Sequence, residues 1–157
     1  MSGQDILKNS GFTGCQTKAG LAEGTNAATI KINATDPAGI HFAIDGIGYY
    51  KANTDNIAVT AHAAQAVSMT CLYLVQIDAD GTVSTKKGNE VLTADLPTGN
   101  SCQWPFPDAD RCPIGGYKVV TDGSTTFTNG TTDLGAAGVT DTYYDFIGGM
   151  PLAPQTS

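Results

Sequence analysis

Short runs of alternating hydrophobic and polar residues recur between residues 28 and 147. Residues 29–33 alternate with a period of two, and residues 69–77 form the most continuous apolar run. Successive side chains of a strand point to opposite faces, so alternation predicts half-buried strands and a continuous run predicts a strand buried on both faces. We expect about eight or nine short strands, drawn from residues 29–33, 41–44, 47–51, 57–60, 69–77, 82–86, 90–93, 117–121, 125–128 and 139–147.

Turn-forming residues separate these runs. Asp45-Gly46 lies between two apolar segments and predicts a two-residue type I′ hairpin turn. Residues 78–81 (Asp-Ala-Asp-Gly) predict a second hairpin. Residues 95–113 contain prolines at a density that excludes a central strand, and the Ala-rich residues 61–67 predict one or two helical turns. Many short strands with frequent turns are typical of an all-β sandwich, either jelly-roll or immunoglobulin-like.

The chain has 157 residues, which fits one domain with extensions at its ends. Residues 1–27 show no helical or strand periodicity and predict an N-terminal arm, either a frayed end or a segment that orders against a partner. Residues 28–147 are expected to form the β-sandwich. Residues 148–157 are expected to form an extended C-terminal tail.

The net charge of the chain bears on two classes of partner, nucleic acids and membranes. Charged residues make up only 15% of the chain, and the net charge is −7. An acidic surface repels phosphates, so we expect no nucleic acid partner and no binding to anionic membranes. The sequence shows neither a secretory signal nor an apolar run long enough to span a membrane, so we expect synthesis in a cytoplasm.

Residues of the kind that carry catalysis do not form a recognisable pattern. The histidines are His41 and His62, and no G-x-S-x-G element accompanies them. The start of residues 78–81 resembles a calcium-binding loop, but the sixth and twelfth positions of that loop are Val83 and Asn89. We therefore expect no catalytic residues, no metal site and no cofactor, and we assign Asp78 and Asp80 to a turn.

The four cysteines leave two alternatives open. Cys102 and Cys112 flank the Pro-rich loop, and a disulfide between them would add roughly 3 kcal/mol of stability on the chain-entropy model. Synthesis in a cytoplasm favours free thiols instead. Cys71 lies in an apolar run and is expected to be a small buried hydrophobe.

Six aromatic residues are the candidates for a contact surface. Aromatic side chains in loops and at strand ends either close the ends of a core or anchor protein interfaces. The candidates are Trp104, Phe106, Tyr49, Tyr50, Tyr143 and Tyr144.

Several blocks of the sequence resemble virion proteins of tailed bacteriophages. The similar proteins are encoded near the major capsid protein and form the head decoration, or cement, family. The resemblance covers roughly residues 40–147. Its blocks are residues 42–52, 54–61, 71–78, 113–120 and 127–134.

The resemblance implies a structural protein on the outer surface of the phage head. Such a protein would bind the major capsid protein, fasten neighbouring subunits and form a homotrimer. It implies no catalytic or ligand-binding residue. The alternative that we keep is a tail-associated or receptor-binding module, in which exposed Trp104, Tyr49 or Tyr50 would stack on sugar rings.

Overall fold

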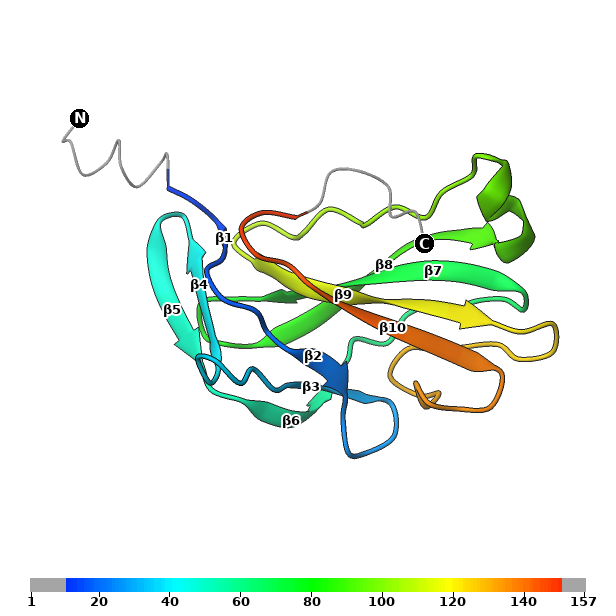
Figure 1. Cartoon of the computed structure of the whole chain (residues 1–157), viewed down its shortest axis with the longest axis horizontal. Helices are drawn as coiled ribbons and strands as arrows, with labels where there is room; N and C mark the ends of the chain where they lie inside the picture. Colours follow the sequence, from blue (N-terminus) through cyan, green and yellow to red (C-terminus); the bar gives the residue numbers. More distant parts are fainter. Residues whose placement is uncertain (1–10, 151–157) are drawn as a thin grey trace.

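The computed structural model describes residues 11–150, which form three antiparallel β-sheets (Figure 1). The largest sheet has the strand order β10 (Val139–Asp145), β9 (Cys112–Thr121), β7 (Met69–Ile77) and β8 (Val83–Leu92). One small sheet has the order β1 (Gly14–Cys15), β4 (Ile40–Ile44) and β5 (Ile47–Lys51). The other has the order β2 (Leu21–Glu23), β3 (Thr29–Ile32) and β6 (Thr54–Ala58). The prediction of an all-β chain is confirmed, with ten strands instead of eight or nine.

The two small sheets pack against the four-stranded sheet as the second layer of a sandwich (Figure 1). Strands β1 and β4 contact β9, whereas β2 contacts β10 and β6 contacts β8. We call the apolar layer between the sheets the inner core. At its centre the rings of Tyr73 and Tyr117 stack with centroids 5.3 Å apart, and Phe127 meets Tyr73 edge-on.

Strand β7 is buried on both of its faces, as its continuous apolar run predicts. Tyr73 and Val75 belong to the inner core, whereas Leu72 and Leu74 point to the opposite side of the sheet. A second cluster, which we call the outer core, covers that side. Its buried members are Leu72, Leu74, Val91, Cys102, Trp104 and Phe146.

Both predicted hairpins are confirmed. Asp45 and Gly46 have positive φ angles of 50° and 79°, as a type I′ turn requires, and Ile44 pairs with Ile47. In the second hairpin the Asp78 carboxylate accepts hydrogen bonds from the backbone N–H groups of Asp80 and Thr82, at 3.1 and 2.8 Å. Asp78 therefore has the turn-forming role that its position predicts.

Residues 11–27 belong to the folded domain, so placing the end of the arm at residue 27 was wrong. This segment contributes β1 and β2, and Cys15, Ala19 and Leu21 are buried. Strands of two and three residues are too short to show a period in the sequence. Residues 1–10 of the predicted arm lie outside the described residues.

The beginning of the predicted tail is also held by the domain. Cys15 and Gly148 exchange two backbone hydrogen bonds, of 3.1 and 2.7 Å, and Met150 packs against the outer core. The tail therefore does not begin at residue 148. Residues 151–157 lie outside the described residues.

Two further local predictions were wrong. Residues 61–67 form no helical turn, and residues 125–128 form no strand; the two segments meet in an isolated bridge between Gln65 and Phe127. The helix in residues 11–150 is a six-residue 3-10 segment, Thr93–Thr98. None of the described residues form a helix long and apolar enough to cross a membrane.

Candidate interaction surface

Three exposed hydrophobic side chains belong to the β4–β5 hairpin and to two segments, around Phe12 and Ile147, that are hydrogen-bonded to the hairpin or to β1. Phe12 is 49% exposed, Ile47 is 48% exposed and Ile147 is 58% exposed. The Phe12 carbonyl accepts a hydrogen bond of 2.9 Å from Gly46, the residue before Ile47. The Phe12 ring also lies over Gly14 next to the carbonyl of Gly148, the residue after Ile147. We call these three residues the end patch; Ile47 lies on the same face of the small sheet as Tyr49, and the Phe12 ring lies on the opposite face, over Gly14.

Strand β5 beside the end patch is an open sheet edge. It pairs with β4 on one side and is the last strand of its sheet. Because the hairpin makes Ile44 and Ile47 a hydrogen-bonded pair, alternation along the ladder turns the backbone groups of Gly48 and Tyr50 outward. Such an edge offers unpaired N–H and C=O groups to another chain.

The six aromatic candidates divide between the surface and the core. Phe106 and Tyr50 are 76% and 55% exposed, so both remain contact candidates. Trp104 is only 7% exposed and packs edge-on against Tyr144 and Phe146 in the outer core. For Trp104 the structure shows the core-closing alternative.

The three remaining tyrosine candidates are half-buried. Tyr49 stacks on Phe42 with ring centroids 5.6 Å apart, and Tyr143 packs against Tyr117 at 5.8 Å. The exposed members of the end patch were missed by the sequence analysis, which considered aromatic residues in loops and at strand ends. The position of Ile47 directly after the Asp45-Gly46 turn was the signal that could have identified one of them.

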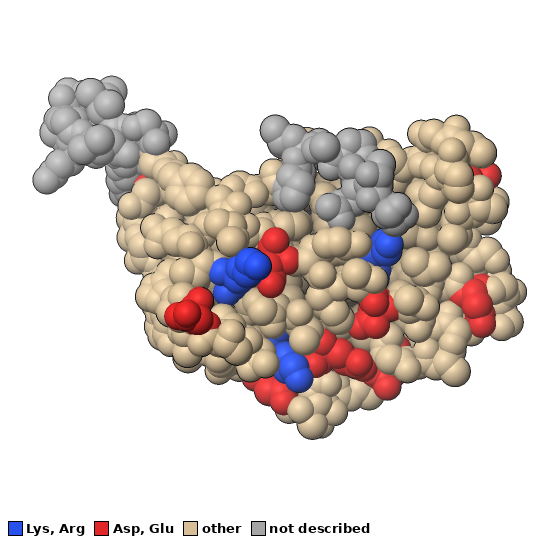
Figure 2. Space-filling model, viewed as in Figure 1, with Lys and Arg blue, Asp and Glu red and all other residues tan. Residues whose placement is uncertain are grey.

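Charge is sparse over the visible face of the molecule. Figure 2 shows scattered acidic and fewer basic side chains, separated by wide uncharged stretches. This distribution is in keeping with a chain whose net charge is −7 but whose charged residues make up only 15%. Removing water from an uncharged surface costs less free energy than removing it from a charged one, which favours contact with another protein.

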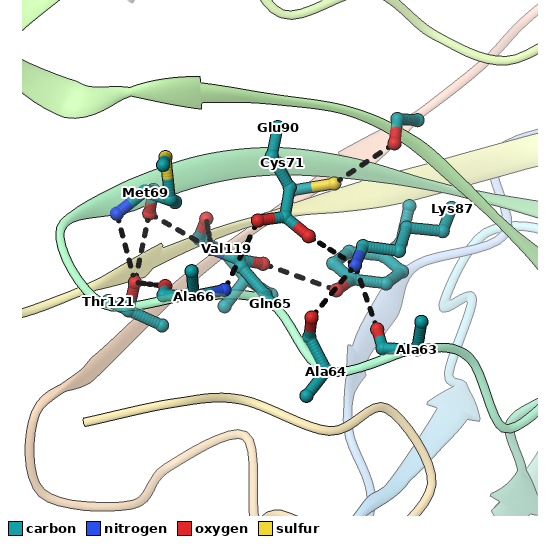
Figure 3. Close-up of polar contacts among 12 residues, drawn as sticks. Ala63, Ala64, Gln65, Ala66, Met69, Cys71, Lys87, Glu90, Val119 and Thr121 are labelled. Carbon is teal, nitrogen blue, oxygen red and sulfur yellow. Dashed lines mark hydrogen bonds and ion pairs between the residues drawn. The ribbon is translucent and has the colours of Figure 1, made fainter.

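The Lys87–Glu90 ion pair has a structural role (Figure 3). The Lys87 ammonium also donates a hydrogen bond of 2.8 Å to the carbonyl of Ala63. Gln65 donates to two strand carbonyls at 2.9 and 3.1 Å. These contacts tie residues 61–67 to the sandwich and explain why that segment is extended instead of helical.

The two histidines lie apart and each has a structural contact. His41 is exposed on β4, where its ring lies 4.9 Å from that of Tyr50. His62 Nε2 lies 2.9 Å from the carbonyl oxygen of Thr85. Among residues 11–150, no three His, Cys, Asp or Glu side chains are placed to hold a metal ion.

One open depression of about 300 Å³ lies between β3 and the loop before β6. Two of its polar side chains, Asn53 and Asp55, form hydrogen bonds that hold the fold. Asn53 bridges Ala34 and Gly39, and hydrogen bonds from Thr25 lower the pKa of Asp55 below its usual value.

A Cys102–Cys112 disulfide is not formed, and the described cysteines are free thiols. Cys102 lies in the outer core, where its thiol donates to the carbonyl of Thr70 at 3.2 Å. Cys112 lies in the inner core, where its Sγ is 3.9 Å from that of Cys15. The four-stranded sheet separates the two residues, although they are close in the sequence.

Acidic side chains from three segments approach one another beside β2. Desolvation and the neighbouring Asp133 carboxyl raise the pKa of Glu23, and Asp141 on β10 adds a further negative charge. Glu23 Oε1 accepts a hydrogen bond of 3.0 Å from the backbone N–H of Gly135. The folded protein therefore binds a proton at Glu23 more tightly than the unfolded chain does.

Replacement of Glu23 by Gln should remove the loss of folding stability that ionisation of Glu23 causes as the pH rises. Since the pKa of Glu23 is raised by folding, its contribution to stability is fully present below the unfolded value and is lost as the pH rises through the folded value. In urea unfolding, the free energy of unfolding of Glu23→Gln relative to the natural chain should be higher at pH 7 than at pH 4. A difference between the two proteins that is the same at both values would contradict the assignment.

Comparison of the chain with family models, with curated proteins and with solved structures returned no match.

Proposed function

We propose that this chain is a virion structural protein, a capsid decoration or cement protein of a tailed bacteriophage. It binds the outer surface of the head and stabilises contacts between subunits of the major capsid protein. The observation that carries the proposal is the end patch beside the open edge of β5. Together they supply apolar side chains and unpaired backbone groups on one end of a sandwich.

The two features complement each other as a docking surface. Phe12, Ile47 and Ile147 gain about 25 cal/mol for each Å² of apolar surface that a partner removes from water. The outward backbone groups of Gly48 and Tyr50 can pair with a strand of the partner, which adds hydrogen bonds and fixes direction. A shell protein with an exposed strand is a suitable partner.

The resemblance to decoration proteins favours the same region. Its first block, residues 42–52, contains most of β4 and all of β5. The hairpin that carries Ile47 and the open edge is thus among the segments similar to that family.

Decoration stabilises a shell by mass action. A protein that binds the assembled shell but not its separated subunits shifts the equilibrium toward assembly, and many symmetric copies multiply the effect. We propose a homotrimer as the bound form, made in the host cytoplasm and placed on the capsid exterior. The net charge of −7 opposes binding to the packaged nucleic acid and favours this external position.

Cryo-electron microscopy of purified virions tests the proposal. The expected result is external density for this chain at the junctions between capsid subunits. Density confined to the tail, or a virion without the chain, would contradict it.

The alternative is a tail-associated module that binds glycans. The exposed rings of Tyr50 and Phe106 favour it, because flat aromatic faces stack on sugars. Two other residues expected to stack on sugars do not favour it: Trp104 is buried, and Tyr49 is stacked on Phe42. Tail density in the same reconstruction would favour this alternative.

A further inference from the structure

Two buried cysteines that are far apart in the sequence touch in the inner core. Cys15 and Cys112 are 97 positions apart, and their Sγ atoms are separated by 3.9 Å. Cys15 Sγ also lies 3.5 Å from the carbonyl oxygen of Pro113, so β1 and the beginning of β9 approach closely at this point. The two thiols are 1% and 0% exposed.

Both thiols lie in the inner core and both contact the carbonyl oxygen of Pro113. Each sulfur could be replaced by another small apolar group if packing were its whole purpose. Strand β1 has only two residues and is held by β4 and by Gly148, so its position depends on few contacts. A covalent bond here would join the beginning of the described chain to the first residue of β9, an inner strand of the four-stranded sheet.

We propose that Cys15 and Cys112 form a disulfide when the protein enters an oxidising environment, fastening β1 to β9. With a small-molecule disulfide as the oxidant, the thiolate of one cysteine attacks it and releases one thiol. The second cysteine then attacks the mixed disulfide and releases the other thiol. The two cysteines lose two electrons and two protons, and the oxidant is reduced to two thiols. The sulfurs approach from 3.9 Å to about 2.05 Å.

The surroundings make this reaction slow in the folded protein. A hydrogen bond with Cys112 and burial raise the pKa of Cys15 above its usual range, so little of the reactive thiolate is present. The oxidant reaches the pair only when β1 separates from the core. The oxidation rate should therefore become independent of oxidant concentration once opening limits it.

The test uses the full chain, purified in reductant and equilibrated with oxidised and reduced glutathione. After denaturation and alkylation, mass spectrometry should count two free thiols, at Cys71 and Cys102, and find a peptide linking Cys15 to Cys112. The oxidised protein should melt roughly 10 °C above the reduced protein, since the bond closes a loop of 97 positions.

Single variants test whether the disulfide forms between Cys15 and Cys112 or involves another cysteine. Cys102→Ser should still form the bridge, whereas Cys15→Ser and Cys112→Ser should not form it and should melt alike with and without oxidant. Four free thiols at equilibrium, or a linked peptide that contains Cys71 or Cys102, would overturn the proposal. If Cys15→Ser does not fold, the peptide map of the natural chain decides alone. The outcome is independent of where the protein resides in a virion.

Discussion

Ile47→Asp is expected to weaken binding to phage heads by about a hundredfold, which corresponds to about 2.7 kcal/mol. Ile47 is the member of the end patch that lies next to the open edge of β5. A carboxylate there would have to be dehydrated against the shell, and the apolar contact would be lost. Sedimentation of the purified variant with heads that lack this chain measures the affinity.

Leu92→Asp is the matched control for this variant. The Leu92 side chain has the same size as that of Ile47 and a similar exposure of 40%. Leu92 pairs with Met69 at the beginning of β7, whereas Cys112, which contacts β1, pairs with Ile77 at the end of β7. It should bind heads like the natural chain. Equal weakening by the two substitutions would show that added negative charge, and not the end patch, determines binding.

Trp104→Ala should lower the free energy of unfolding by about 3–5 kcal/mol. Trp104 is the largest side chain of the outer core, and it covers the outward face of β7 at Leu72 and Leu74. Its removal leaves a cavity and exposes those leucines to water. Urea unfolding followed by circular dichroism measures the change.

Phe106→Ala provides the comparison within the same loop. Phe106, like Trp104, is followed by a proline but is exposed to solvent, so its truncation should change the free energy of unfolding by less than about 0.5 kcal/mol. A large loss for Phe106→Ala together with a small one for Trp104→Ala would mean that the loop covers the sheet differently.

The parts of the fold that local sequence determines could be predicted. Asp45-Gly46 has the turn chemistry of a two-residue hairpin, and the run at residues 69–77 is long enough to identify a doubly buried strand. Strand β1 could not be predicted, because it has two residues and pairs with the distant strand β4. Strand β2 has only three residues, too few to show alternation. The same holds for residues 61–67, whose conformation depends on hydrogen bonds to other strands.

The candidate surface was only partly predictable, because exposure is decided by tertiary contacts. Trp104 and Phe106 have similar local surroundings in the sequence, yet one is buried and the other is exposed. The difference arises at Gly116, where the absence of a side chain leaves room for the Trp104 ring. No local pattern shows that the segments around Phe12 and Ile147 both lie beside Gly14.

Which cysteines lie close together also could not be predicted from local sequence. Nearness in the sequence suggested Cys102 and Cys112 as a possible pair, but they lie on opposite faces of a sheet. The thiols that touch belong to Cys15 and Cys112, which the alternation of β9 and the short strand β1 bring together. Only the arrangement of the layers could reveal this pair.

The orientation of the chain on the phage head tests the end patch most directly. In a reconstruction of the virion, Phe12, Ile47 and the open edge of β5 should face the major capsid protein. A chain that docks through its opposite end, with the end patch turned to solvent and contacting no subunit, would contradict the proposed mode of attachment.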